Sequence, residues 1–373
     1  MRIAIDCRAF QQLSRYLGIG AYTSNLIQAL AQANGRHQFI PFAQIAKREV
    51  EPVDSPFGRR GDPGFRIAGK YSFLNQLTAH RVDLCHMLEF APPFAPAHRA
   101  VVTVYDLIPL IFPDIYLPWY RVRNRWNFRA YYRFLKEARQ IVAISHRTKA
   151  DLIRFLGIPR DRIRVIYPGI NPAFRPLSHS WEIQPVLRQY GIPSPYILYV
   201  GSCDYRKNIG GLMRAFARFR EGEFGEFRLV LVGKGTELNR ESLREYGEGL
   251  GLGRYLHLAG YLPLRQLVAL YNGAAMLVYP SFYEGFGFPP LEAMACGIPV
   301  VTSRNSALSE VTGGSALLVD PYNENELAEA MRRMALDHGL RKTLIQKGLA
   351  HVWRFGWSRT AQETLQVYDQ IGA

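Results

Sequence analysis

The feature that most constrains the fold is an alternation of short apolar runs with longer amphipathic segments, which occurs twice along the chain. Runs typical of buried strands lie at 2–5, 101–104, 140–144, 196–200, 227–232, 276–279 and 299–301. Helical spacing of apolar positions occurs at 22–33, 149–156, 209–219, 289–296, 324–336 and 357–371. Alternating strands and helices favour parallel sheets, so the sequence predicts an α/β protein with two doubly wound, Rossmann-like domains facing a central cleft.

A stretch dense in proline and glycine separates the two series. It extends from Tyr167 to Pro195 and is the predicted linker. We therefore expect an N-terminal domain over residues 1–175 and a C-terminal domain over residues 186–355.

Charge is distributed unevenly between the halves. Residues 1–180 contain 26 Lys/Arg and 12 Asp/Glu, a balance of +14, whereas residues 181–373 contain 20 and 19, a balance of +1. A basic lobe suits an anionic partner, which could be nucleic acid, an acidic lipid surface or a phosphorylated substrate.

Several classes of protein lack support. Asp106 interrupts the most apolar segment, so no run reaches the ~18 residues of a membrane span. The first ten residues carry three charges and no apolar signal core, which favours a cytoplasmic protein with reduced cysteines. The nine histidines and four cysteines show no metal-ligand spacing. Neither a Walker A motif nor a full GxGxxG is present, so ATPase and dehydrogenase functions are not indicated.

Two adjacent cations follow a predicted strand of the second series. Arg206 and Lys207 stand between the run at 196–200 and the helix expected at 209–219. Ligands of open α/β sheets bind outside the carboxyl ends of the strands, where paired cations suit a phosphate. A solvated basic turn is the alternative.

The most informative segment is YPSFYEGFGFPPLEAMACG at 279–297. A strand ends, Gly285 and Gly287 let backbone amides approach a ligand, and prolines begin a helix. The helix N-terminus carries about half a positive charge, which would stabilise a diphosphate. Glu284 and Glu292 could accept hydrogen bonds from sugar hydroxyls. Alternatively, Glu292 complements the helix dipole.

Glu284 and Glu292, eight positions apart within EGFGFPPLE, resemble the paired-glutamate motif of the retaining glycosyltransferases of family 4, which have the two-domain GT-B fold. Other segments resemble that family in the same order, and together they cover almost the whole chain. They are LGIGAY at 17–22, which resembles the N-terminal glycine loop of the family, VAIS at 142–145, YPGI at 167–170, RKN at 206–208, and the stretches 257–271 and 280–321.

The resemblance implies a role for each matching position. Glu284 would hold hydroxyls of the transferred sugar, and Glu292 would hold the ribose. Arg206 and Lys207 would bind the diphosphate and stabilise the leaving group. The C-terminal helix, within 356–373, would pack back on the N-terminal domain. The donor-binding residues would be Gly18, Gly20, Arg206, Lys207, Glu284, Gly285, Phe286, Gly287 and Glu292.

The resemblance also implies a mechanism. Family members retain anomeric configuration by a front-face, oxocarbenium-like route in which the donor phosphate helps to deprotonate the acceptor, and they need no metal. The sequence agrees in having no Asp-x-Asp pair that would hold a metal–nucleotide complex. We therefore expect no cofactor, and the nucleotide-sugar is a co-substrate.

One position departs from the family pattern. Many relatives have a His-Asp pair where this chain has Tyr105 and Asp106. Either the Tyr105 hydroxyl positions the sugar or Asp106 takes that task, which would make Asp106 catalytic. The alternative for Asp106 is a cap at the end of a strand.

Residues 119–136 combine five arginines and a lysine with seven aromatic residues. A basic, aromatic helix is typical of a membrane-surface element, and also of a platform for single-stranded nucleic acid. The third interpretation places the aromatics in the core and the arginines in solvent. Because family members often glycosylate lipid-linked acceptors, we favour contact with a lipid diphosphate or an anionic membrane through Arg121, Arg123, Arg125 and Trp126.

The function expected is transfer of a sugar to a saccharide or a lipid-diphosphate-linked acceptor during synthesis of a cell-surface polysaccharide such as lipopolysaccharide. TVYDLIPLIFP and YRKNI look most like the bacterial mannosyltransferases, which favours GDP-mannose, with a UDP-sugar as the alternative. The protein would be cytoplasmic and peripheral at the inner face of the plasma membrane. No nucleic acid is expected as a partner, although a nucleic-acid-binding protein and a nucleotide-sugar epimerase are the alternatives from other classes.

Overall fold

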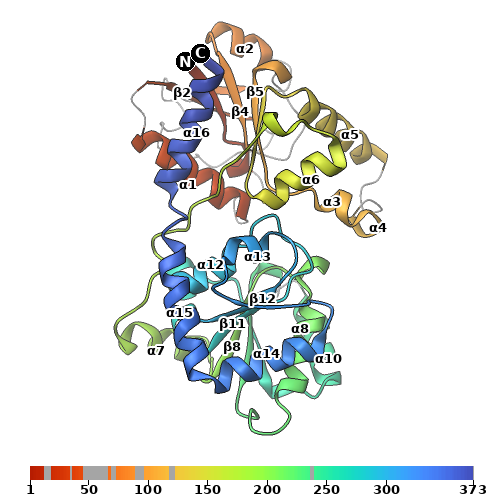
Figure 1. Cartoon of the computed structure of the whole chain (residues 1–373), viewed down its shortest axis with the longest axis vertical. Helices are drawn as coiled ribbons and strands as arrows, with labels where there is room; N and C mark the ends of the chain where they lie inside the picture. The colour runs from red at the N-terminus through yellow and green to blue at the C-terminus, as the bar shows by residue number, and fades with distance from the viewer. Residues whose placement is uncertain are drawn as a thin grey trace. The chain divides into compact units, whose positions relative to one another are not determined.

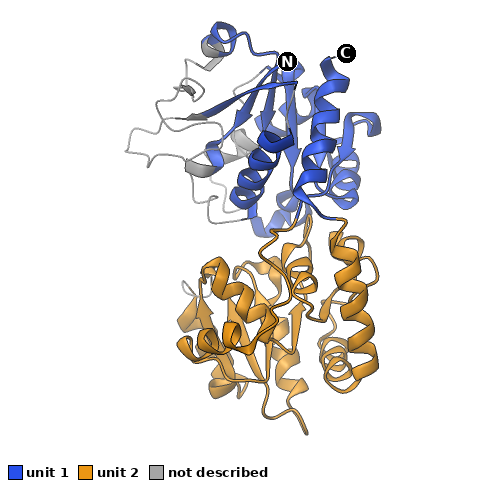
Figure 2. Cartoon of the chain, turned by 90° about the vertical axis from the view of Figure 1, so that its left-hand side faces the viewer, with its two compact units in different colours: residues 1–169, 355–373 blue, residues 170–354 orange. Residues whose placement is uncertain are grey.

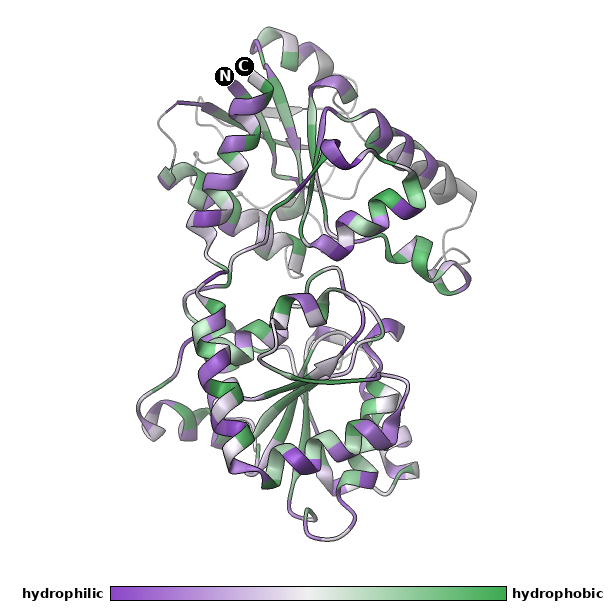
Figure 3. Cartoon of the chain, in the orientation of Figure 1, coloured by the Kyte–Doolittle hydropathy of each residue, from purple (hydrophilic) through white to green (hydrophobic). Residues whose placement is uncertain are grey.

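The computed structural model describes residues 1–11, 18–33, 36–44, 66–68, 73–88, 96–116, 122–235 and 239–372. The chain divides into two compact units (Figure 2). Unit 1 comprises residues 1–169 and 355–373, and unit 2 comprises residues 170–354. Each unit is built on its own parallel sheet, and the strands of both sheets are largely hydrophobic (Figure 3).

The sheet of unit 1 has the strand order β3-β2-β1-β4-β5-β6-β7, and every neighbouring pair is parallel. In the centre, Ile3 lies opposite Phe39 on one side and Leu84 on the other. The central strands are buried, as parallel strands covered on both faces should be. The strands are β1 (Arg2–Asp6), β2 (Gln38–Gln44), β3 (Arg66–Ala68), β4 (Leu84–Met87), β5 (Ala100–Val104), β6 (Gln140–Ala143) and β7 (Ile163–Val165).

The helices of unit 1 include one with a clear capping pattern. The Ser145 side chain accepts a hydrogen bond from the Thr148 amide at 3.0 Å, and Gly157 ends the helix in the left-handed conformation. The helix begins at His146, three residues earlier than predicted. The helices are α1 (Gly18–Ala33), α2 (Phe73–Ala79), α3 (Ile108–Ile111), α4 (Pro113–Tyr116), α5 (Val122–Glu137), α6 (His146–Leu156) and α16 (Trp357–Gly372).

The C-terminal helix packs on the first unit, as predicted. α16 lies beside α1 (Figure 1). The Tyr368 hydroxyl is 2.6 Å from Nδ1 of the buried His86 on β4, and the Thr360 hydroxyl donates to the Tyr167 carbonyl at 2.7 Å. Residues from both ends of the chain therefore form one core.

The predicted glycine loop is wrong for Gly18 and Gly20. Both lie in the first turn of α1, and Gly20 is buried. Glycine costs a helix conformational entropy, and the burial of Tyr22, Leu26 and Ile27 on α1 outweighs that cost. Leu17, the first residue of that motif, lies outside the described residues.

The sheet of unit 2 has the order β10-β9-β8-β11-β12-β13, again with parallel neighbours. Counted within the unit, this is the order 3-2-1-4-5-6 of a dinucleotide-binding domain, whose order reverses between β8 and β11. The strands are β8 (Tyr196–Val200), β9 (Arg228–Val232), β10 (Leu256–Gly260), β11 (Met276–Tyr279), β12 (Val300–Ser303) and β13 (Leu317–Val319).

Helices cover this sheet in packed pairs: α8 contacts α14, α7 contacts α11, and α12 contacts α15. The linker predicted for 167–195 contains a helix, α7, which includes Pro185 and packs its Leu187 inward. Breaker residues indicated a loop there, and packing against α11 overrides them. The helices are α7 (Ser180–Gln189), α8 (Ile209–Phe219), α10 (Arg240–Gly249), α11 (Leu264–Gly273), α12 (Phe288–Ala295), α13 (Ala307–Thr312), α14 (Glu324–Leu336) and α15 (His338–Val352).

The basic, aromatic segment forms helix α5. In its second half Tyr131 and Phe134 are buried, whereas the Arg133 side chain is 82% exposed and pairs with Glu137 at 3.0 Å. This half follows the interpretation with aromatics inside and arginines in solvent. Arg121 and the side chains of Arg123, Arg125 and Trp126 lie outside the described residues.

Candidate functional site

The candidate site lies in unit 2, at the point where the strand order reverses. β8 pairs with β11, so the segments that follow these two strands are neighbours at the carboxyl edge of the sheet. Arg206 and Lys207 belong to a short 3₁₀ turn after β8, and Glu284 belongs to the loop after β11. A crevice at such a reversal is the usual ligand site of doubly wound sheets.

Asn208 holds the loops around the site together. Its side-chain amide donates to the carbonyls of Pro280, at 3.2 Å, and Pro321, at 2.7 Å. Its side-chain oxygen accepts from the Gly211 amide at 3.2 Å and so caps α8. Asn208 has a φ of +55°, a conformation that asparagine tolerates better than most residues. The loops after β8, β11 and β13 are therefore fixed to one side chain.

Two cations share one carboxylate at this site. Arg206 Nη1 donates to Glu284 Oε2 at 2.5 Å, and Lys207 Nζ donates to Glu284 Oε1 at 2.6 Å. Glu284 is 6% exposed and Lys207 is 9% exposed. The amide of Phe282 also donates to the Arg206 carbonyl at 2.7 Å, which joins the two loops through their backbones. The structure thus brings together three residues selected from the sequence.

The protonation of these groups follows from burial and from their mutual charges. Burial alone would raise the pKa of Glu284, but the charges of Arg206 and Lys207 and the Lys207 hydrogen bond outweigh it and lower the pKa to about 2. Burial, and then the Arg206 charge, lower the pKa of Lys207 to about 8, although Glu284 and Asp204 oppose them. At pH 7 the carboxylate is ionised and the ammonium is largely charged.

Tyr279, the last residue of β11, also belongs to this cluster. Its hydroxyl accepts a hydrogen bond from Lys207 Nζ and donates one to Glu284 Oε1 at 2.9 Å. The ring stacks on Tyr199 of β8, with centroids 5.9 Å apart and planes at 21°. Tyr279 is not among the residues predicted from the sequence, because it stands at the end of a strand with the pattern of a buried one. Its place before a loop with a candidate carboxylate was the available signal.

Glu292 has a different partner. It lies on α12 and accepts a hydrogen bond from the Tyr271 hydroxyl of α11 at 2.7 Å. Burial raises the pKa of Glu292 to about 7, and the Tyr271 hydrogen bond only partly offsets that effect. The carboxylate is therefore close to half-protonated at neutral pH.

The loop between the two glutamates is tightly packed. Gly287 has a φ of +114°, and a Cβ there would lie 2.5 Å from Leu308 Cδ2. The Phe286 side chain is buried against Phe288, with centroids 5.1 Å apart, so it belongs to the packing of the loop. Gly285 is buried as well.

Two candidates from unit 1 form contacts within that unit. Asp106 Oδ1 accepts a hydrogen bond from the Ile108 amide at 3.1 Å, within the connection between β5 and α3. The Tyr105 hydroxyl donates to the Leu88 carbonyl at 2.8 Å, and its ring meets Tyr22 edge to face.

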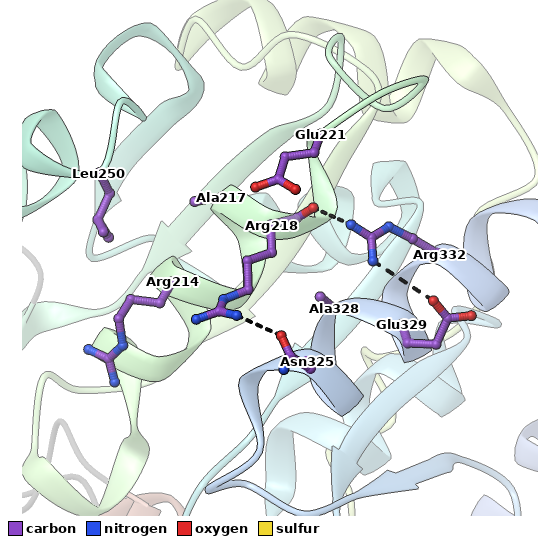
Figure 4. A pocket seen from close by; sticks show the side chains of 9 residues that line it. All are labelled: Arg214, Ala217, Arg218, Glu221, Leu250, Asn325, Ala328, Glu329 and Arg332. Carbon is purple, nitrogen blue, oxygen red and sulfur yellow. Dashed lines mark hydrogen bonds and ion pairs between the residues drawn. The ribbon is translucent and has the colours of Figure 1, made fainter.

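A hollow of about 680 Å³ lies between α8 and α14 and contains none of the predicted residues (Figure 4). Arg214 and Arg218 pair with Glu324 there, and Arg218 also donates to Asn325 at 2.6 Å. Its lining residues lie on or next to α8, α10 and α14, not in the loops at the carboxyl ends of the strands, so this hollow is a weaker candidate than the cluster after β8 and β11.

The described residues contain neither a cluster of metal ligands nor a helix suited to a membrane. No three of their His, Cys, Asp or Glu side chains gather closely enough to hold a metal ion. None of the helices in the described ranges combines the length and the apolar character needed to cross a bilayer.

Comparison with known proteins agrees with this arrangement. The model "Glycosyltransferase Family 4" matches residues 16–174, and "Glycosyl transferases group 1" matches residues 187–351. O-antigen chain mannosyltransferase B of Escherichia coli is 35% identical over 276 residues, which cover 73% of this chain and 71% of that protein. Serotype-specific mannosyltransferase WbdA of Escherichia coli is 26% identical over 410 residues, covering 100% of this chain but 48% of that protein.

A solved structure extends the agreement to the fold. Sucrose-phosphate synthase from Thermosynechococcus elongatus superposes with a TM-score of 0.78 at 24% identity, and the match covers 100% of this chain and 99% of that one. Three findings lead to one conclusion: family models match both units, a relative exceeds 30% identity, and each unit is built on a parallel sheet. The chain is an enzyme with the GT-B fold and belongs to the family 4 glycosyltransferases.

Proposed function

We propose that this enzyme transfers mannose from GDP-mannose to a saccharide or a lipid-linked acceptor in the synthesis of a cell-surface polysaccharide, with retention of configuration and without a metal ion. The observation that carries the proposal is the pairing of Arg206 and Lys207 with the buried Glu284. The choice of mannose rests on the two relatives named as mannosyltransferases.

The charges of the cluster suit a sugar diphosphate. Arg206, Lys207 and Glu284 together carry a net charge of +1, and Asp204, 3.5 Å from the Arg206 guanidinium, balances it. A diphosphate that enters would attract Arg206 and Lys207 to its oxygens. Glu284 would then have lone pairs free to accept hydrogen bonds from the sugar hydroxyls. The donor would exchange one set of charge-assisted hydrogen bonds for another.

The same groups would favour the transition state. As the glycosidic C–O bond breaks, negative charge grows on the departing diphosphate, and fixed cations beside it become more stabilising. Preorganised groups of this kind contribute about 3 kcal/mol each. A phosphate oxygen would accept the proton of the attacking hydroxyl on the same face of the sugar, which accounts for retention.

The remaining assignments follow from position. Glu292 would accept hydrogen bonds from the ribose, and its ionised form would accept them most strongly. The backbone of residues 285–287 and the start of α12 would face the diphosphate. Unit 1, with the basic helix α5, would receive the anionic acceptor at the inner membrane surface. Flotation with anionic and neutral liposomes tests this last assignment, and equal binding to both would refute it.

A donor screen tests the proposal as a whole. GDP-, UDP- and ADP-sugars are compared by thermal shift, since a ligand bound only by the folded protein raises its apparent stability. We expect GDP-mannose to stabilise the enzyme most, to be consumed only with acceptor and without added metal, and to form an α-linkage detectable by NMR. Lys207→Ala should reduce transfer by about 100-fold or more. Preference for a UDP-sugar would refute the donor assignment, and consumption without acceptor would indicate an epimerase or a hydrolase.

A further inference from the structure

Tyr279 has no role in the proposed chemistry, yet its hydroxyl contacts two of the three groups that carry it, Lys207 and Glu284. The hydroxyl accepts from the Lys207 ammonium and donates to Glu284 Oε1 at 2.9 Å, and the ammonium donates to the same oxygen at 2.6 Å. The three side chains therefore form a closed triangle of hydrogen bonds. Phenylalanine could fill the same space but could make neither hydrogen bond.

The tyrosine ring is also the best-anchored member of the triangle. Tyr279 is buried in β11, pairs with Thr302 of β12, and accepts a hydrogen bond from the Thr302 hydroxyl at its carbonyl. Its ring stacks on the buried Tyr199, whose hydroxyl donates to the Ser202 carbonyl at 2.9 Å. Lys207 and Glu284, in contrast, belong to a turn and a loop and have long side chains with more rotatable bonds.

We propose that Tyr279 is a positioning residue, which keeps the Lys207 ammonium and the Glu284 carboxylate aligned when a sugar diphosphate replaces part of their pairing. This inference rests on the proposed function, because it requires both groups to act on the donor. When the charge of a phosphate draws the Lys207 ammonium toward it, the ion pair between Lys207 and Glu284 weakens. The Tyr279 hydroxyl still contacts both, and a displacement of about 1 Å at such a site can reduce the rate about 100-fold.

Loss of the hydroxyl has a second, electrostatic consequence. The charged groups around Lys207 are Arg206, Asp204 and Glu284, and they stay in place when the hydroxyl is removed. Burial and Arg206 would continue to disfavour the ammonium, which would have one acceptor fewer. The pKa of Lys207, about 8 in the native protein, should therefore fall further.

The test compares Tyr279→Phe with a matched control, Tyr196→Phe. Tyr196 is another buried tyrosine of this sheet, on β8, and its hydroxyl donates to the Leu270 carbonyl at 2.6 Å, outside the charged cluster. We expect Tyr279→Phe to lower kcat by about 10- to 100-fold with a smaller change in donor KM. The alkaline limb of its kcat profile should move to lower pH by about one unit. Tyr196→Phe should lower Tm but keep both kcat and the profile.

Each outcome decides the matter. A Tyr279→Phe enzyme with native kcat and a native pH profile of kcat overturns the inference. An enzyme that loses activity without a change in its pH profile also overturns it, since a structural defect alone would account for that loss. If Tyr279→Phe does not fold, Tyr199→Leu, which removes the ring beneath Tyr279, should shift the profile in the same direction, and an unchanged profile overturns the inference. A wild-type enzyme inactive with every sugar nucleotide refutes the proposed function and this inference with it.

Discussion

Replacement of Glu284 by glutamine removes one negative charge from the cluster and keeps the shape of the side chain. The carboxyl has a pKa of about 2 in place of its ordinary 4.5, and it is almost fully buried. At about 1.4 kcal/mol per pKa unit, that difference is about 3 kcal/mol of preferential stabilisation of the ionised form. Lys207, whose ammonium is disfavoured by burial, offsets part of it. We expect Glu284→Gln to lose about 2 kcal/mol at pH 7.

The lowered pKa of Glu284 determines how the stability difference between the wild type and Glu284→Gln changes with pH. A carboxylate with a lowered pKa stabilises the fold above its unfolded pKa, and this contribution is lost as pH falls from about 4.5 to about 2. The wild type should therefore exceed Glu284→Gln in Tm by roughly 4–8 °C at pH 7, and the gap should narrow below pH 4. Calorimetry without nucleotide measures this Tm difference, at pH 7 and at the lowest pH where both the wild type and Glu284→Gln fold. An equal or higher Tm for Glu284→Gln at pH 7 would show that the pairing does not stabilise unit 2.

Three further predictions concern single residues. Because the pKa of Glu292 is raised, ionisation of this carboxyl costs stability as pH rises from 4.5 through about 7. Glu292→Gln should therefore have a higher Tm than the wild type at pH 8 but not at pH 5. The same Tm difference at both pH values would contradict this prediction. A Cβ on Gly169 would lie 2.4 Å from the backbone nitrogen of Trp357. Gly169→Ala should therefore destabilise unit 1 by about 2 kcal/mol or more, as measured by urea unfolding. A variant with native stability would exclude the clash. Ser306 has a φ of +62°, so Ser306→Gly should raise stability by about 1 kcal/mol, and a loss would mean that the hydroxyl outweighs the strain.

Much of the fold could be predicted from local patterns. The helices at 209–219 and 324–336 and the strand at 276–279 have the predicted bounds, because apolar periodicity depends only on neighbouring residues. The exceptions are instructive. α7 forms in spite of Pro185 because Leu187 packs inward, and Gly18 begins a helix where a loop was predicted.

The candidate site shows the same division. Arg206, Lys207 and Glu284 could be selected because each follows a predicted strand and each matches a family motif. The roles of Tyr279 and Asn208 could not be predicted, since these roles depend on partners on other segments. Asn208, for example, binds the carbonyl of Pro321, 113 positions away.

By itself, the sequence determined which segments become strands and helices and which charged side chains stand at strand ends, because those properties depend on residues within a few positions of each other. Only the tertiary structure decided that β8 lies beside β11, which places Arg206 within 2.5 Å of Glu284 across 78 positions. Strand order depends on how whole helices pack over the sheet. The free energy of that packing comes from many contacts between distant segments, so no single motif in the sequence predicts it.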